Sequence, residues 1–409
     1  MKPTRILGIL ALALVIGLAG CQKDENLTSE PLNQQDEFTN LVEYQDGDII
    51  SGQYIVVIEG EHMKKASWEK LDYATKRETI KQQASGILAR NNLAKREAKH
   101  VFSSMLQGFS AEFSKDEIAR LKKDDQVKYI ENDRYVALSP PEWANNDDDE
   151  DEGSTGQETP WGITRVNGGV DATGKVAWIL DSGIDLDHPE LNVDENRSYT
   201  VFTRGRDKDP NDNNGHGTHV AGTIAAIDND QGVVGVAAGA TVVAVKVLDA
   251  TGSGSYSGVI EGIDYVGANG SAGDVANLSL GGPTSDALDE AVLSASQNAI
   301  IFSLAAGNDS DNANNYSPAR VNGNNIYTIS AMDDTDYWAS FSNYGNPPVD
   351  YCAPGVNIKS TWKDGGYNTI SGTSMATPHA AGVLLLGNAS SDGTVSGDPD
   401  GDPDSIIYN

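Results

Sequence analysis

Three residues with the side chains needed for acyl transfer stand in separate segments, in the chain order Asp181, His216 and Ser374. A hydroxyl attacks a carbonyl well when an imidazole takes its proton and a carboxylate orients that imidazole. Each residue alone has an ordinary explanation. Asp181 could cap a turn, Ser374 could be a helix N-cap, and His216 could bind a metal ion together with His219. No carboxylate-bearing metalloprotease helix accompanies the two histidines, however, and the three residues together favour a catalytic group.

The sequence around each of the three residues suits this chemistry. Asp181 follows the apolar run 175–180, so its carboxylate should emerge where a buried strand ends. Glycines on both sides of His216 let the backbone and a substrate approach the ring closely. Ser374 stands at the start of a helical run that extends to Leu386, and a helix N-terminus favours developing negative charge.

Apolar runs alternate with helical stretches between about Trp161 and Gly387. This alternation is typical of a parallel sheet that is covered by helices on both faces. Active sites in such sheets lie at the carboxyl ends of the strands. The predicted strands are 176–180, 242–248, 275–280, 299–305 and 326–330.

The segments that hold these residues resemble the signature segments of the subtilisin-like serine proteases, and more narrowly those of proteinase K and its relatives. The order Asp, His, Ser is also that of subtilisin. The resemblance implies a serine endopeptidase with a three-layer α/β catalytic domain, which we expect over residues 158–388. The matching segments are Asp181–Ile184, His216–His219, Gly372–His379, Gly252–Val259, Asn277–Gly282 and Ser340–Gly345.

The resemblance also implies further site residues. Asn308 matches the asparagine that binds the oxyanion in the family, with the backbone N–H of Ser374 as the second donor. A substrate would bind as an added strand, which gives broad specificity, and small pocket residues favour a large apolar side chain before the cut. The expected edge and pocket residues are Gly254, Ser255, Tyr256, Ser279, Leu280, Gly281, Ala305, Ala306 and Gly307.

The resemblance implies structural Ca2+ and no catalytic metal. Asp350 matches a calcium-ligand aspartate of proteinase K, and hard cations require several oxygen ligands. The loop 319–325 departs in length from the relatives, which leaves the backbone ligands of that site open. The acidic segments 207–212 and 398–404 are also rich in oxygen, and we interpret both as turns without a ligand.

A short basic start, an apolar run from Ile6 to Leu18 and small residues before Cys21 predict an export signal over residues 1–20. Residues 18–21 resemble the bacterial lipobox, which implies a lipid on Cys21 that anchors the exported precursor to a membrane. Cys352 is then left without a disulfide partner, and we expect a buried, inert thiol.

A polar tether is predicted over residues 21–52, followed by a small α+β domain over residues 53–139. Its elements are expected in the order β-α-β-β-α-β, as in a ferredoxin-like fold, with a first helix that reaches about His100 and a capping box at Ser114–Glu117. This block resembles the inhibitory propeptide of the same protease family. An unrelated small binding domain is the alternative.

The expected partners are protein or peptide substrates, the chain's own propeptide and, through the lipid, a membrane. A formal net charge of -31 argues against nucleic acid. Residues 140–157 read as an acidic, cleavable linker, whose cleavage would release the enzyme outside the cell. Residues 389–409 read as an acidic tail, and the relatives continue with covering helices instead. The rival interpretation is a catalytically inactive or autoinhibited surface scaffold of the same fold.

Overall fold

The computed structural model describes residues 45–60, 66–138 and 156–409. The predicted export signal, Cys21, most of the tether and nearly all of the acidic linker lie outside the described residues. Within these ranges, the helices are too short or too polar to cross a membrane.

The N-terminal domain, residues 45–138, has the predicted order of elements. They are β1 (Ile49–Ile58), α1 (Tyr73–Arg90), β2 (Val101–Phe102), β3 (Gly108–Glu112), α2 (Lys115–Leu121) and β4 (Val127–Ala137). The strands form an antiparallel sheet in the order β4-β1-β3-β2. The predicted capping box is present, with reciprocal bonds between Ser114 and Glu117.

Helix α1 ends at Arg90, ten residues before the predicted end. The side chain of Asn91 donates to the carbonyl of Ile87 at 2.9 Å, and Asn92 has a positive φ of 58°. A left-handed residue at this point stops the helix, which the lysine-rich composition of the following segment did not indicate.

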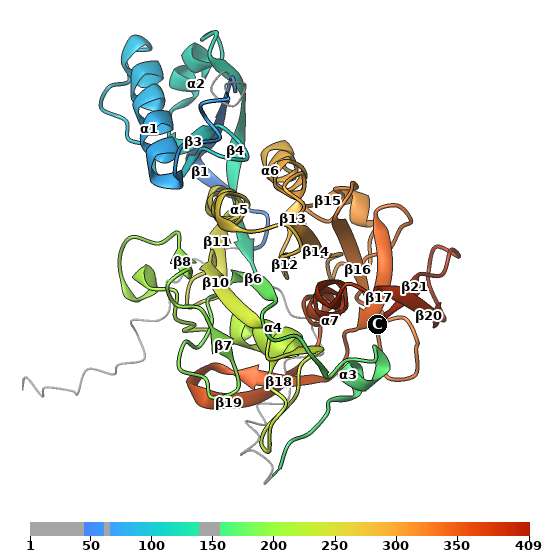
Figure 1. Ribbon diagram of the computed structural model, residues 1–409. Coiled ribbons are helices and arrows are strands. Elements are labelled where there is room, and N and C mark those ends of the chain that lie inside the picture. The colour runs from blue at the N-terminus through green and yellow to red at the C-terminus, as the bar shows by residue number, and fades with distance from the viewer. Residues whose placement is uncertain (1–44, 61–65, 139–155) are drawn as a thin grey trace, which may run out of the picture. The chain divides into compact units, whose positions relative to one another are not determined.

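The larger domain, residues 156–409, is built on a sheet in the order β20-β21-β17-β16-β14-β12-β6-β10-β7, with β8 also paired to β10 (Figure 1). All five predicted strands belong to it, and the strands from β10 to β17 along this order are parallel. The parallel strands are β6 (Val176–Asp181), β10 (Thr241–Lys246), β12 (Val275–Leu278), β14 (Ile301–Ala305), β16 (Ile326–Met332) and β17 (Val349–Pro354). The outer strands are β7 (Asn192–Val193), β8 (Tyr199–Thr200), β20 (Ser390–Thr394) and β21 (Ser405–Tyr408).

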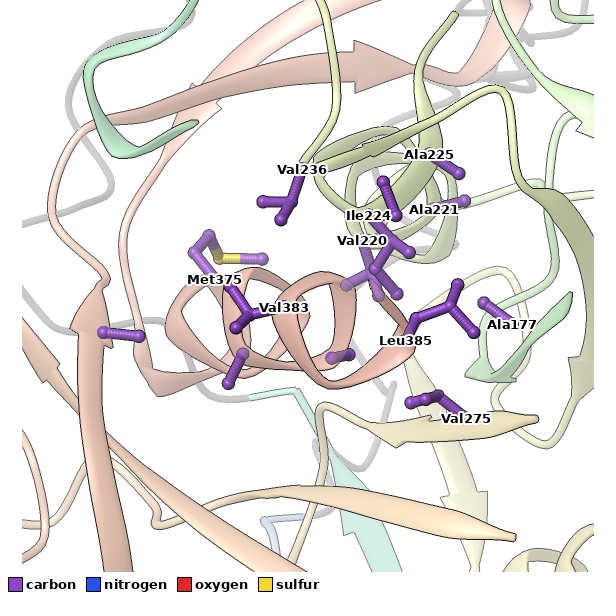
Figure 2. Packing of buried hydrophobic residues seen from close by; sticks show 14 of the residues in the cluster. Ala177, Val220, Ala221, Ile224, Ala225, Val236, Val275, Met375, Val383 and Leu385 are labelled. Atoms are coloured by element: carbon purple, nitrogen blue, oxygen red, sulfur yellow. The ribbon is translucent and has the colours of Figure 1, made fainter. Parts of the chain in front are cut away.

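Helices cover both faces of this sheet, because successive residues of each buried strand point to opposite sides. Ile179 of β6 packs on one side with α4 (His216–Ala225) and α7 (Thr373–Leu386). Its neighbour Trp178 packs on the other side with α5 (Tyr256–Asn269) and α6 (Asp286–Ser296). Figure 2 shows side chains of α4 and α7 meeting above β6 and β12. The predicted three-layer α/β architecture is confirmed.

Short elements complete the larger domain around these layers. They are α3 (Trp161–Arg165), β5 (Val170–Asp171), β9 (Ala237–Ala238), β11 (Ser253–Ser255), β13 (Gly282–Pro283), β15 (Tyr316–Ser317), β18 (Ile358–Trp362), β19 (Gly366–Ile370), and the short 3-10 helices η2 (Arg206–Lys208), η3 (Ala313–Asn315) and η4 (Lys363–Gly365).

The structure corrects the expectation of an acidic tail after the last helix. Strands β20 and β21 pair with each other, and β21 joins the central sheet through Ile406, which pairs with Cys352 of β17. Ile406 is fully buried and packs in one cluster with Met332, Trp338, Cys352 and Val395. The apolar pair 406–407 is too short to give a periodic signal beside the run of aspartates. Cys352 is the expected buried free thiol.

The buried position of Ile406 predicts that the C-terminal strands contribute to stability. Ile406→Ala should lower the free energy of unfolding by about 2 to 5 kcal/mol, the usual cost of truncating a buried isoleucine. The measurement is denaturant unfolding of the precursor, carrying Ser374→Ala to prevent self-digestion. Leu293→Ala is the control, since Leu293 is 44% exposed, and it should change the midpoint little. Equal effects of the two substitutions would contradict a structural role for β21.

Candidate active site

Asp181 and His216 meet at the carboxyl end of the sheet. Asp181 is the last residue of β6 and is fully buried, and His216 is the first residue of α4. The Nδ1 atom of His216 lies 2.9 Å from both carboxylate oxygens of Asp181. The carboxylate therefore holds the Nδ1 proton, which leaves Nε2 as the ring nitrogen that can accept one.

Two glycines allow this close approach. A Cβ atom on Gly217 would lie 2.1 Å from the carbonyl oxygen of Gly183 and 3.2 Å from the Cβ of Asp181. Gly215 has a φ of 119°, and a Cβ there would lie 2.3 Å from the ring of Trp362. A side chain on Gly217 would push the start of α4 away from the end of β6, and one on Gly215 would push it away from Trp362 of β18.

Asp212, which the sequence analysis did not single out, fixes the loop that carries His216. It is 3% exposed, and its two oxygens accept hydrogen bonds from the hydroxyl of Ser182, the backbone N–H groups of Asn214, Gly215 and Thr218, and the hydroxyl of Thr218. Burial raises the pKa of Asp212, and these donors oppose that effect. The sequence held one indication of this role, because Asp212 stands four residues before His216 and the residues between them, Asn and Gly, are typical of turns.

The electrostatics of His216 follow from burial and from its partner. Burial lowers the pKa of His216, but the Asp181 carboxylate outweighs burial and raises that pKa above its ordinary value. His219 has no such partner. Its Nε2 lies 2.9 Å from the carbonyl oxygen of Ile358, and burial lowers the pKa of His219 to about 3. These contacts favour a structural role for His219 over a metal ion shared with His216.

Ser374 is the second residue of α7, at the same end of the sheet. Its hydroxyl donates to the carbonyl oxygen of Ser279 at 3.1 Å, and the hydroxyl of Ser279 donates to the carbonyl oxygen of Ser374 at 2.8 Å. The side chain of Asn277 donates to the Ser279 hydroxyl at 2.8 Å. Within the described residues no hydrogen bond joins Ser374 to His216. The Ser374 hydroxyl is hydrogen-bonded to the carbonyl oxygen of Ser279 instead.

Asn308 lies beside Ser374. Its Oδ1 accepts hydrogen bonds from the backbone N–H and the hydroxyl of Thr373, both at 2.9 Å, which fixes the orientation of the amide. A Cβ atom on Gly372 would lie 3.6 Å from Nδ2 of Asn308 and 3.7 Å from the backbone nitrogen of Ser374. The two N–H donors that were expected to bind an oxyanion therefore border the same small space.

One of the two predicted substrate edges is occupied by the N-terminal domain. Strand β11 pairs antiparallel with the end of β4, so that Gly254 faces Val136 and Ser255 faces Tyr135. The backbone N–H of Leu138 continues this pairing by donating to the carbonyl oxygen of Gly252 at 3.0 Å. This edge therefore accepts a strand, as a substrate edge must.

The other predicted edge and pocket residues lie near the strand ends. Ser279, Leu280 and Gly281 directly follow β12, and residues 305–307 connect β14 to Asn308. Tyr256 differs from the expectation, because its side chain is fully buried and its hydroxyl donates to the carbonyl oxygen of Pro283. The buried side chain of Tyr256 packs in the core next to β11 and exposes no surface to a ligand.

Two buried carboxylates of helix α5 bind the N-terminal domain. Asp264 accepts hydrogen bonds from three consecutive backbone N–H groups, those of residues 103–105, at 2.6 to 2.8 Å. Glu261, one turn earlier, contacts the guanidinium of Arg77 and lies 2.8 Å from Nδ1 of His100. The two domains thus share a polar contact surface besides the paired strands.

Asp350 is the residue that was expected to bind calcium, and it lies in β17. Its side chain is exposed, and Oδ2 accepts the backbone N–H of Thr328 at 2.9 Å. Among the described residues, no three His, Cys, Asp or Glu side chains cluster closely enough to hold a metal ion. A cation at Asp350 would therefore take most of its ligands from backbone carbonyls and water.

The Asp181–His216 contact predicts how the imidazole titrates. Because the folded pKa is raised, the pair stabilises the fold fully below the unfolded pKa of about 6.5, and this contribution is lost as the pH rises through the folded pKa. Asp181→Asn should lower the pKa of His216 below its ordinary value, since burial is then opposed only by the weaker effect of the Asp212 charge. An NMR titration of the ring in Ser374→Ala protein measures it. Asp185→Asn, in the segment directly after β6, is the control. An equal change in the pKa of His216 in both variants would contradict the role of Asp181 as the partner of His216.

Comparison with known proteins agrees with this geometry. Residues 173–392 match the subtilase family and residues 53–139 match the peptidase inhibitor I9 family. Alkaline serine exoprotease A of Vibrio alginolyticus is 39% identical over 389 residues, which cover 92% of this chain and 68% of that protein. Extracellular serine proteinase of Thermus sp. (strain Rt41A) is 39% identical, over 83% of this chain and 80% of that protein.

A solved structure shows the same fold. The crystal structure of a cold adapted subtilisin-like serine proteinase aligns with a TM-score of 0.55 and 40% identity, over 61% of this chain and 97% of that one. The family matches span both described domains, and the relatives are named as serine proteases. The chain therefore belongs to the subtilase family and is a subtilisin-like serine endopeptidase with an I9 inhibitor propeptide.

Proposed function

We propose that this chain is the exported precursor of an endopeptidase in which Ser374 is the nucleophile, His216 the general base and Asp181 the residue that orients His216. The observation that carries the proposal is the contact between Asp181 and His216 at the carboxyl end of the sheet. At that end α7 presents Ser374, and the loop after β14 holds Asn308 against Thr373 of α7. A carboxylate, an imidazole, a hydroxyl and two convergent N–H donors are the parts that peptide hydrolysis by acyl transfer requires.

The reaction follows from these positions. The Ser374 hydroxyl turns from the carbonyl of Ser279 toward Nε2 of His216, which takes its proton as the oxygen attacks the scissile carbonyl carbon. Asp181 stabilises the imidazolium that forms. The negative oxygen of the tetrahedral intermediate accepts hydrogen bonds from Asn308 Nδ2 and Ser374 N, each such donor being worth roughly 2.7 to 4 kcal/mol. His216 then protonates the leaving amine, and water hydrolyses the acyl-enzyme by the same steps in reverse order.

The substrate would replace the propeptide strand on β11. Backbone pairing with Gly254 and Ser255 gives affinity to any extended sequence, which supports broad specificity. Small residues at 305–307 support a preference for a large apolar side chain before the cut. In the precursor, β4 occupies this edge, so the propeptide inhibits the enzyme until it is cut away.

Export and lipidation belong to the same proposal. The expected signal over residues 1–20 and the lipid on Cys21 would place the precursor at a membrane surface, and cleavage within residues 140–157 would release the catalytic domain. The names of the relatives, an exoprotease and an extracellular proteinase, support export.

Processing of the purified precursor tests the nucleophile. Wild type should cut itself within residues 140–157, whereas Ser374→Ala should stay intact, as read by intact mass and N-terminal sequencing after incubation with calcium. The mass of the released N-terminal fragment also reports acyl chains on Cys21. Ser390→Ala, at an exposed position, is the control and should process normally.

Two results would contradict this mechanism. Cleavage of both wild type and Ser374→Ala would assign processing to another protease. An intact chain in both would favour the inactive scaffold.

Calcium binding at Asp350 is a second part of the proposal. Removing Ca2+ with a chelator should lower the melting temperature of the precursor, and Asp350→Asn should abolish this calcium dependence, because the amide lacks the charge that attracts the cation. Thermal unfolding with and without calcium measures the effect. Asp364→Asn is the control, since that carboxylate is 88% exposed and lies elsewhere. A calcium-dependent increment that persists in Asp350→Asn would place the ion at another site.

A further inference from the structure

Two carboxylates of the propeptide point from β4 into the catalytic domain. Glu131 and Asp133 are two residues apart and so lie on the same face of the strand. Asp133 is fully buried, and its oxygens accept the backbone N–H of Ser257 at 3.1 Å and the hydroxyl of Ser257 at 2.5 Å. Glu131 accepts the hydroxyl of Ser285 at 2.5 Å.

Both carboxylates sit at the N-termini of long helices. Ser257 is in the first turn of α5, which has 14 residues, and Ser285 is the N-cap of α6, which has 11. Burial raises the pKa of Glu131, opposed by hydrogen bonds from Ser285 and from the backbone of Ala287 and Asp286. Unpaired N–H groups and the helix dipole make such ends favourable for anions.

The charge of Asp286 opposes the carboxylate of Glu131 and helps to raise its pKa, but Arg320 partly neutralises the acidic residues at the start of α6. Asp286 and Asp289 lie in its first turn, and both are paired with the guanidinium of Arg320 at 2.8 and 2.5 Å. The donors therefore remain available to a carboxylate from outside the helix, which is the group that the structure places there.

The donors at Ser257 and Ser285 belong to the catalytic domain, whereas the carboxylates leave with the propeptide. Gln53 of the propeptide, which also donates to Asp133 at 2.6 Å, leaves with them. The end of β4 and a bound substrate use the same edge, with Tyr135 opposite Ser255. A substrate that pairs with β11 would continue along the path of β4. Its residues two and four positions before the partner of Ser255 then take the places of Asp133 and Glu131.

We propose that the mature enzyme has two carboxylate subsites, at the N-termini of α5 and α6, which favour protein substrates with Asp or Glu at two positions two residues apart on the N-terminal side of the cleaved bond. This inference rests on the proposed function. Residues 156–409 carry 32 Asp and Glu against 10 Lys and Arg, a formal net charge of -22, which disfavours acidic chains in general. The preference for acid is therefore confined to these two positions.

A positional scan tests the subsites on the mature wild-type enzyme. Internally quenched peptides of one neutral sequence carry a single Asp, or Asn as the matched control, at each successive position before the cut, and mass spectrometry identifies the cleaved bond. At two positions, with one residue between them, kcat/KM for the Asp peptide should exceed kcat/KM for the matched Asn peptide about three- to tenfold. The intervening position faces the other way and should show no gain.

Two enzyme variants assign the subsites. Ser257→Ala should reduce the Asp over Asn ratio at the nearer position alone, and Ser285→Ala at the farther position alone. Using the ratio removes any general loss of activity in either variant. A flat scan on an enzyme that cleaves the Asn peptides would overturn the subsites and leave the protease mechanism standing. Failure to cleave every peptide would overturn the proposed function, and the subsites with it.

Discussion

The structure depends on keeping one buried carboxylate charged next to one imidazole. Asp181 has no exposed surface, and burying a carboxylate away from water is costly unless hydrogen bonds replace that water. His216 and the backbone of Ser182 supply them. Much of the surrounding sequence serves this contact: the end of β6 fixes the carboxylate, the glycines around His216 permit the approach, and Asp212 holds the loop by five hydrogen bonds.

The propeptide uses the same physical means as a substrate and adds others. Its last strand takes the backbone donors and acceptors of β11, which any extended chain could do. Its acidic side chains accept hydrogen bonds at the N-termini of α5 and α6. Its own backbone N–H groups donate to the carboxylate of Asp264. Because these contacts are polar and partly outside the β11 edge, the propeptide can bind more specifically than a peptide of the same length.

Much of this arrangement could be predicted from the sequence, for reasons that differ between elements. The parallel strands are short apolar runs bounded by turns, and Asp181, His216 and Ser374 stand in segments that resemble the signature segments of the family. The end of α1 at Arg90 could not be predicted, since it depends on the single left-handed residue Asn92. The role of Asp212 and the pairing of β21 with β17 depend on contacts between residues far apart in the chain, which local patterns do not encode.

The late position of α7 and β21 in the chain has a consequence for synthesis. The propeptide is assembled from neighbouring segments, whereas the last strand of the sheet pairs with a strand some fifty residues earlier, and the backbone of Asn409 bonds to Val166 across most of the catalytic domain. Closing such long loops is slow compared with forming local contacts. A growing chain therefore completes its I9 propeptide long before Ser374 has been synthesised, and under the proposed mechanism no active enzyme exists before its inhibitor.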